Sequence, residues 1–210
     1  MDLILRQSRV LALGAHPDDV EFGCFGALAV AAEASIAILS RGEKGGDPEK
    51  RVSEAYESAK LVGANLTVLD HPDTRLMIPD LVSSLEQIIS EMKPSVVLTM
   101  SDDDLHQDHQ AVAVATQIAL RSFDGPILAY GTPSSIDKFS PNVILGLSKS
   151  EMNIKLRAIQ LHRSQEARQY MQAPFVESIA RYWAAMSRTG SEYGEPFRLV
   201  RWYSTARSSD

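Results

Sequence analysis

One short segment near the start of the chain concentrates side chains that could bind a metal. Ala15-His16-Pro17-Asp18-Asp19-Val20-Glu21 places an imidazole and three carboxylates in a single turn-length stretch. Adjacent carboxylates repel one another and seldom share a site unless a cation is present. Either Asp18 or Asp19 would serve equally well as the N-cap of a following helix. This segment alone therefore leaves both a metal site and a capped helix open.

A second segment, residues 104–109, carries the sequence Asp-Leu-His-Gln-Asp-His and adds two more imidazoles. Two histidines and an aspartate drawn from the two segments would make a three-ligand set with one coordination position left for water. Catalytic zinc sites have this layout, whereas structural zinc sites are closed by a fourth protein ligand. The same ligand types also accept iron(II), cobalt or manganese. The two segments together favour a catalytic metal site far more strongly than either does alone.

Nucleotide binding and serine chemistry are both disfavoured by the same stretch. Pro17 removes a backbone donor that a phosphate would need, and the carboxylates of Asp18 and Asp19 would repel the phosphate. Neither a GxxxxGK[ST] phosphate loop nor a GxSxG nucleophile elbow occurs in the chain.

The elements that must position these residues alternate between strand-length and helix-length patterns. Apolar, β-branched runs predict strands at residues 10–14, 35–40, 66–69, 95–100, 127–130 and 143–147. Helical spacing predicts helices at residues 22–34, 48–62, 79–92, 109–121, 149–164 and 174–187. Pro48 and Pro79 fall in first helical turns, and Gly63 marks a helix end. The alternation predicts one α/β domain over residues 1–210, with a doubly wound, mostly parallel sheet and helices on both faces.

In such a sheet, ligands bind outside the carboxyl ends of the strands. The loops that follow the first four predicted strands cover residues 16–21, 41–47, 70–75 and 101–109, and they hold nearly all the reactive side chains. The sequence therefore predicts that the two metal-binding segments face each other at one edge of the sheet.

The composition excludes several classes of partner. The net charge is −6 and the sequence pI is about 5.4, so no basic field attracts nucleic acid. No apolar stretch approaches the length of a membrane span. A single cysteine, Cys24, excludes an internal disulfide framework and favours a buried packing role. We therefore expect a cytoplasmic protein that acts on a small molecule.

The chain resembles the LmbE-like, or PIG-L, family of metal-dependent N-deacetylases. The resemblance covers most of the sequence and rests on motifs that occur in the family's order. They are AHPDD at 15–19, SRGEKG at 40–45, RVSEA at 51–55, HPDTRL at 71–76, HQDH at 106–109, HRSQ at 162–165 and YGEPF at 193–197.

The resemblance implies a Rossmann-like fold with a single zinc ion. It implies that the metal ligands are His16, Asp19 and His109. It also implies a general base at Asp18, and a pair formed by His106 and Asp108 that supports the oxyanion or the leaving amine.

Three further positions match residues that line the substrate pocket in family members acting on sugars: Glu43, Arg51 and Asp73. Glu43 and Arg51 fit equally well as a loop anchor and a solvated helix charge. The implied activity is removal of the acetyl group from an N-acetylglucosamine-type amino sugar or its conjugate, by an enzyme that can form a homo-oligomer. The alternatives are a zinc amidohydrolase acting on another N-acyl amine and a non-catalytic metal- or carbohydrate-binding module.

Other polar residues have weaker signals. The acidic stretch Asp102 to Asp104 is either a solvated turn or the rim of the site, where it would disfavour an anionic substrate unless nearby Lys44, Lys50, Arg51 and Arg75 offset it. His71 is expected on the surface or in packing rather than on the metal. His162 is expected in core or inter-subunit packing. The C-terminal aromatics are expected to close a core or an interface.

Overall fold

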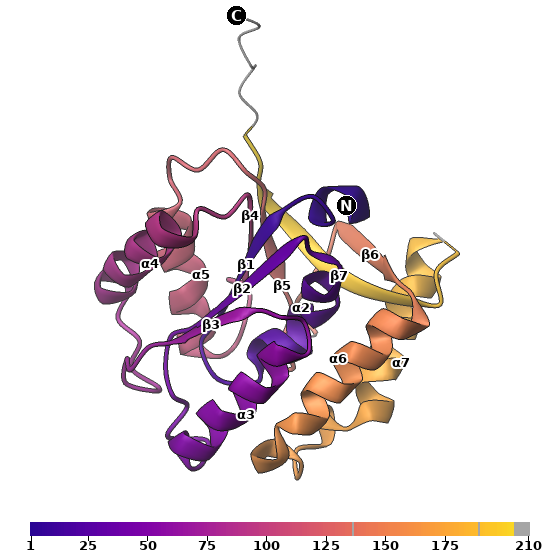
Figure 1. Cartoon of the computed structure of the whole chain (residues 1–210), viewed down its shortest axis with the longest axis horizontal. Coiled ribbons are helices and arrows are strands. Elements are labelled where there is room, and N and C mark those ends of the chain that lie inside the picture. The colour runs from indigo at the N-terminus through magenta and orange to yellow at the C-terminus, as the bar shows by residue number, and fades with distance from the viewer. Residues whose placement is uncertain (136, 189, 204–210) are drawn as a thin grey trace, which may run out of the picture.

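A mixed β-sheet of seven strands organises the part of the chain that the computed structural model describes, residues 1–135, 137–188 and 190–203. The strand order is β3-β2-β1-β4-β5-β7-β6 (Figure 1). The strands are β1 (Arg9–Gly14), β2 (Glu33–Ile38), β3 (Asn65–Val68), β4 (Val96–Met100), β5 (Ile127–Tyr130), β6 (Val143–Leu147) and β7 (Tyr193–Arg201). The first five strands are parallel to one another. Strands β2 and β3 lie on one side of β1, whereas β4 and β5 lie on its other side, so the order of the strands switches between β1 and β4. The predicted mostly parallel α/β fold is confirmed.

Helices cover both faces of the sheet (Figure 1). On one face, α4 (Ile78–Met92) packs against α5 (Gln107–Ala119). The other face carries α2 (Asp19–Val30), α3 (Pro48–Lys60), α6 (Lys149–Leu161) and α7 (Ala173–Ser187). A short helix α1 (Asp2–Leu5) precedes β1, and two 3-10 turns, η1 (Arg163–Gln165) and η2 (Gln169–Met171), join α6 to α7. No helix in the described ranges is long and apolar enough to cross a membrane.

The central strands are apolar because both of their faces are covered. Every residue of β4 is buried, and in β1 only Arg9 is exposed. Such strands have nearly continuous apolar sequences rather than alternating ones. Pro48 and Pro79 begin their helices as predicted, and Gly63 has a positive φ of 63° just beyond α3.

Strand β7 is missing from the sequence prediction, and this omission was wrong. Gly194 and Pro196 interrupt its pattern, since Pro has no N–H to donate to a sheet. The strand forms because it runs antiparallel between β5 and β6 and turns Tyr193, Glu195 and Phe197 into the core. Burial of Tyr193 and Phe197 confirms that these C-terminal aromatics close a core, whereas Trp202 is more than half exposed.

Helix α2 begins three residues earlier than predicted and also ends earlier, so β2 starts at Glu33 opposite Arg9. The helix kinks at Cys24, whose φ of −145° is not helical. The kink frees the N–H groups of Gly26 and Ala27, which donate to the Glu195 carboxylate over 3.0 and 2.7 Å. Glu195 thus acts as an internal cap supplied by β7.

Candidate metal-dependent active site

A cavity of about 490 Å³ lies at the carboxyl ends of the central strands, where the loops after β1, β2, β3, β4 and β5 meet. Its lining includes both predicted metal-binding segments. The residues are His16, Asp18, Asp19, Phe22, Lys44, Gly45, Arg51, Asp73, Thr74, His106, His109, Pro133, Ser134, Arg168, Tyr170 and Met171.

His16 is held with one ring nitrogen facing Asp19. The Ser40 hydroxyl donates to the carbonyl of Ala15 over 2.8 Å and fixes the start of the His16 loop against β2. His16 Nε2 lies 3.0 Å from Asp73 Oδ1 and 3.2 Å from Asp108 Oδ2, and Nδ1 lies 3.5 Å from Asp19 Oδ2. The carboxylates of Asp73 and Asp108 therefore orient the ring and leave Nδ1 available as a metal ligand.

His109 is oriented in the same way from the opposite side of the site. Its Nδ1 lies 2.9 Å from Asp104 Oδ2, and its Nε2 lies 3.4 Å from Asp19 Oδ1. Hydroxyl groups of Thr132 and Ser134 also donate to the Asp104 carboxylate. This carboxylate–imidazole pair is the usual outer-sphere support of a metal-binding histidine.

Asp19 faces both histidines of the predicted ligand set, each with a different oxygen. Its Oδ2 atom lies 3.5 Å from His16 Nδ1, and its Oδ1 atom lies 3.4 Å from His109 Nε2. Two groups of described residues bring one donor atom of each member within 4.8 Å of the others. They are His16, His106 and His109, and His16, Asp73 and Asp108, so the predicted set of His16, Asp19 and His109 is not among them.

The electrostatics of the cluster call for positive charge. Burial alone would lower the pKa of His109, but the charge of Asp19 and the hydrogen bond with Asp104 raise that pKa to about 9. Burial would also lower the pKa of His16, but hydrogen bonds with Asp108, Asp19 and Asp73 raise that pKa well above its usual value. A divalent cation bound to neutral imidazoles would balance the negative charge of these carboxylates in the same way.

Asp18 is held in a conformation that few residues adopt. Its φ is 114°, and its Oδ2 atom is buried without a hydrogen-bond partner. Arg51 donates to the carbonyls of Gly42 and Pro17 over 2.6 and 2.7 Å and lies 3.4 Å from Asp18 Oδ1. Burial, with the adjacent Asp19, raises the pKa of Asp18 to about 6 against the opposing charge of Arg51. A buried carboxyl group with this pKa suits a general base near neutral pH.

His106 does not pair with the carboxylate of Asp108, in contrast to the expectation. The Asp108 carboxylate faces His16 and also accepts the backbone N–H groups of Thr74 and Leu76, over 2.7 and 3.3 Å. Instead, His106 caps α5, and its Nδ1 accepts the backbone N–H of Asp108 over 3.2 Å. Burial and the neighbouring imidazoles lower the pKa of His106. A neutral His106 that accepts at Nδ1 carries its proton at Nε2.

The three predicted substrate-binding residues have different environments. Asp73 and Arg51 line the cavity, but Arg51 is only 2% exposed and therefore is not a solvated helix charge. Glu43 is exposed, does not line the cavity, and accepts the backbone N–H of Asp73 over 2.9 Å. Its position is that of a loop anchor.

The acidic stretch after β4 divides into two parts, and neither forms a negatively charged rim. Asp104 is buried against His109, which lowers the pKa of Asp104 to about 2 although burial acts in the other direction. Asp102 and Asp103 both form ion pairs with Arg198 of β7. The expected solvated acidic turn is therefore wrong for Asp104, whose support of His109 the sequence analysis missed.

The two remaining histidines lie away from the predicted metal ligands. His71 Nε2 lies 2.9 Å from the Ser84 hydroxyl of α4, in agreement with a packing role. His162 is buried beneath α2, where its Nε2 lies 3.2 Å from Glu21 Oε1. Its packing is thus within the chain's own core.

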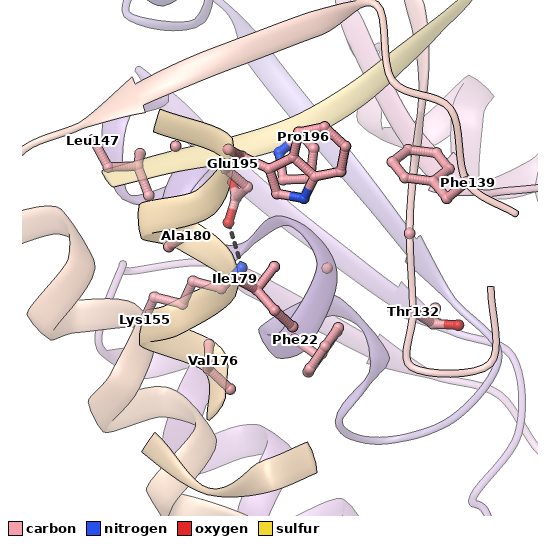
Figure 2. A pocket seen from close by; sticks show the side chains of 14 residues that line it. Phe22, Thr132, Phe139, Leu147, Lys155, Val176, Ile179, Ala180, Glu195 and Pro196 are labelled. Atoms are coloured by element: carbon pink, nitrogen blue, oxygen red, sulfur yellow. Dashed lines mark hydrogen bonds and ion pairs between the residues drawn. The ribbon is translucent and has the colours of Figure 1, made fainter. Parts of the chain in front are cut away.

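Figure 2 shows a second, mostly apolar cavity of about 40 Å³. Phe22 lines both this cavity and the active-site cavity. The lining of the second cavity comes largely from α7 and β7, and Lys155 donates to Glu195 over 2.5 Å at one side. Thr132, which holds Asp104, also lines this cavity. The cavity therefore adjoins the wall that supports His109.

Known proteins resemble both the sequence and the structure. Residues 11–120 match the PIG-L family, described as GlcNAc-PI de-N-acetylase. An uncharacterized deacetylase of Escherichia coli K12, YaiS, is 37% identical over 172 residues, which cover 76% of this chain and 92% of that protein. The chain therefore belongs to the PIG-L family of deacetylases, and it is a hydrolase that acts on amide bonds.

Two solved structures share the fold over nearly the whole chain. A conserved protein of Thermus thermophilus superposes with a TM-score of 0.81 at 26% identity, over 96% of this chain and 98% of that one. The N,N'-diacetylchitobiose deacetylase of Pyrococcus horikoshii gives a TM-score of 0.79 at 24% identity, over 93% of this chain and 85% of the other.

Proposed function

We propose that the protein is a zinc-dependent N-deacetylase that removes the acetyl group from an N-acetylglucosamine-type amino sugar or its conjugate. The observation that carries this proposal is the joint placement of a buried, partnerless carboxylate at Asp18 and a metal-type donor set in one cavity. The P. horikoshii relative acts on an acetylated chitobiose, which supports an amino sugar as the substrate.

In this proposal the metal ligands are His16 through Nδ1, Asp19, and His109 through Nε2. When bound there, zinc lowers the pKa of a coordinated water to about 7 and polarises the acyl carbonyl. Asp73 and Asp108 hold the His16 ring, and Asp104 holds the His109 ring, so each imidazole turns its other nitrogen toward Asp19. Iron(II), cobalt and manganese remain alternatives that the same donors accept.

Asp18 accepts the proton of the attacking water. Asp18 lines the cavity, and its Oδ2 atom has no hydrogen-bond partner in the protein, which leaves this oxygen free to accept a proton. After the attack, the same carboxyl group returns the proton to the departing amine, because the C–N bond cannot break easily without protonation of the nitrogen. A pKa of about 6 suits both steps.

His106 donates a hydrogen bond to the developing oxyanion. Its Nδ1 is committed to the cap of α5, so the Nε2–H group is the one free to act in the cavity. This role requires a neutral ring and does not involve the pairing with Asp108 that the family resemblance implies. Preformed donors of this kind stabilise the transition state without reorganisation.

The alternatives are a zinc amidohydrolase for a different N-acyl amine and a silent binding module. A release assay separates them: the zinc-loaded protein is incubated with N-acetylglucosamine glycosides and with simple N-acetyl amines, with and without a chelator. We expect acetate release from the glycosides that the chelator abolishes. Acetate release from the simple amines alone would contradict an amino sugar as the substrate. Binding of the glycosides without any acetate release would contradict an enzymatic function.

A further inference from the structure

The polar side chains that line the apolar cavity of Figure 2 are engaged with one another or with the surrounding fold. Lys155 and Glu195 point toward each other, and Lys155 Nζ donates to Glu195 Oε1 over 2.5 Å. Both oxygens of Glu195 also accept backbone N–H groups of α2. The Thr132 hydroxyl donates to the carboxylate of Asp104. Cavities with apolar linings stay dry and take apolar ligands, so this cavity suits a hydrocarbon group.

Phe22 separates the apolar cavity from the proposed metal site. Among the residues that the structure describes, it alone lines both the apolar cavity and the active-site cavity. It follows Asp19 by one helical turn, which puts both side chains on the same face of α2. An edge-to-face contact with Tyr170, with ring centroids 6.4 Å apart, holds the ring, which is 9% exposed. Removal of this ring would therefore join the two cavities.

On its other side, the apolar cavity borders a third cavity of about 450 Å³. Phe139, Ile179 and Trp183 line both of them. The third cavity also touches Tyr182, which is exposed on α7. Three cavities thus follow one another from the proposed metal site to the outer face of α7, and Phe22 stands at the inner boundary.

The acyl group is the part of the substrate that Phe22 can contact without loss. The hydroxyl groups of a sugar need hydrogen-bond partners, which a phenyl ring does not provide, whereas an alkyl group needs none. With the acyl carbonyl at the proposed metal position, the alkyl end extends away from the amine. The methyl group of an acetyl then contacts the Phe22 ring, and a longer chain requires the space beyond that ring.

We propose that Phe22 determines the length of the acyl group that the enzyme removes, because its ring closes an apolar cavity that a longer chain would enter. The ligand class of that cavity is therefore a linear alkyl chain. This inference rests on the proposed deacetylase function. It adds a specificity-determining residue on the acyl side of the reaction.

The test compares methyl glycosides of glucosamine that carry an N-acetyl, N-butyryl or N-hexanoyl group. We expect the wild-type enzyme to have its highest kcat/KM with the acetyl compound. Phe22→Leu and Phe22→Ala should open the cavity in two steps. Each methylene that becomes buried contributes about fourfold to binding. The butyryl-to-acetyl ratio of kcat/KM should therefore rise by at least about tenfold in Phe22→Ala, with a smaller rise in Phe22→Leu.

Two further variants distinguish an opened cavity from a merely larger active site. Met171 lines the active-site cavity but not the apolar one, so Met171→Ala should leave the butyryl-to-acetyl ratio unchanged. Ala180 lines the apolar cavity but not the active-site cavity. Ala180→Leu should fill the apolar cavity from α7 and, combined with Phe22→Ala, cancel the gain for the longer chains.

Binding of an alkyl chain separates this inference from the proposed function. Trp183 lines the apolar cavity, and Trp202 is the other tryptophan of the chain. In a Trp202→Phe background, Trp183 is the single fluorescent indole, and 6-bromohexanoate quenches it where the bromine comes close. We expect Phe22→Ala to increase this quenching and Ala180→Leu to reverse the increase. That result supports the inference even if no glycoside is hydrolysed, in which case only the deacetylase proposal fails.

The acyl series and the quenching each provide a result that overturns the inference. One is a Phe22→Ala or Phe22→Leu enzyme that still hydrolyses the acetyl compound and has the same butyryl-to-acetyl ratio as the wild type. The other applies if neither protein hydrolyses any compound: equal quenching of Trp183 with and without the Phe22 ring.

Discussion

Asp18 combines a positive φ with a buried carboxyl group, and both features are costly unless the surroundings impose them. Arg51 supplies that constraint, because it binds the carbonyl of Pro17 before Asp18 and that of Gly42 in the loop after β2, and it lies beside Asp18 Oδ1. Strained residues of this kind concentrate where a reactive group must be held in place. One guanidinium thus fixes the proposed base at the N-terminus of α2.

Replacement of the proposed base separates chemistry from metal binding. Asp18→Asn keeps a residue type that tolerates positive φ, so the fold and the metal content are expected to persist while kcat falls by about 10²–10⁴-fold. His16→Ala is the contrasting variant, since it should lose both metal and activity. Metal content by elemental analysis and acetate release measure the two effects. A fully active Asp18→Asn enzyme would exclude Asp18 as the base.

Asp104 provides a test of the support given to His109. Asp104→Asn should weaken metal affinity by about 10–100-fold, because outer carboxylates fix the tautomer and basicity of a ligand imidazole. The neighbouring Asp103→Asn is the matched control, because Asp103 pairs with Arg198 and does not contact the site. Competition with a chelator of known affinity gives both values. Equal affinities in the two variants would show that Asp104 does not support the ligand.

Metal affinity should also depend on pH. The pKa of His109 in the metal-free protein is about 9, and the metal binds only the neutral ring. Below that pH a proton must leave His109 before the metal can bind, and His16, whose pKa is also raised, must lose one too, so affinity rises with pH at least up to about 9. Each proton released gives about a tenfold change per pH unit. Zinc titrations in buffers of increasing pH check this, and a flat profile would contradict the protonated metal-free site.

At the scale of elements, α2 depends on β7 for its internal cap. The Glu195 carboxylate accepts the N–H groups released by the kink at Cys24, and Lys155 of α6 compensates its charge. Three elements from distant parts of the sequence therefore meet at one buried ion pair directly behind the active-site wall. The kink is an outcome of this tertiary contact.

Removal of one partner of this pair should destabilise the fold. Glu195→Gln leaves Lys155 as a buried cation without a counter-charge, which costs about 3–5 kcal/mol of unfolding free energy. The double variant Glu195→Gln with Lys155→Met should recover much of the loss. Glu177→Gln, at an exposed ion pair with Arg181, is the control and should change little. Urea denaturation measures all of these, and an unchanged midpoint for Glu195→Gln alone would contradict the role of the pair.

At the scale of the whole molecule, the proposed metal site joins loops that leave different strands of the sheet. His16 and Asp19 follow β1 and His109 follows β4, while Asp73 and Asp108 orient the first of these. A ligand that binds only the folded chain stabilises it by mass action, by about 2.7 kcal/mol at a hundredfold excess over Kd.

Removal of the metal should therefore lower the thermal stability. We expect a chelator to decrease the Tm of the wild-type protein and added zinc to restore it. The His16→Ala variant should show the lower Tm with or without zinc. Differential scanning calorimetry provides the measurement. A Tm that is the same in chelator and in zinc would argue against a site that requires the folded arrangement.

Local patterns in the sequence determined much of this molecule. Apolar runs identified β1 and β4, and proline placement identified the starts of α3 and α4, because these signals arise within a few consecutive residues. The segments around His16 and His109 were expected to meet, since parallel strands carry their loops to one edge of the sheet. The structure brings them together there.

The tertiary structure decided the features that depend on distant partners. Strand β7 forms despite Pro196 because β5 and β6 flank it, and α2 kinks because Glu195 accepts its freed N–H groups. The carboxylates of Asp104 and Asp108 orient His109 and His16, and their choice of partner depends on geometry set by several loops. A side chain's type states which contacts it can make, whereas only the folded chain determines which of these contacts are within reach.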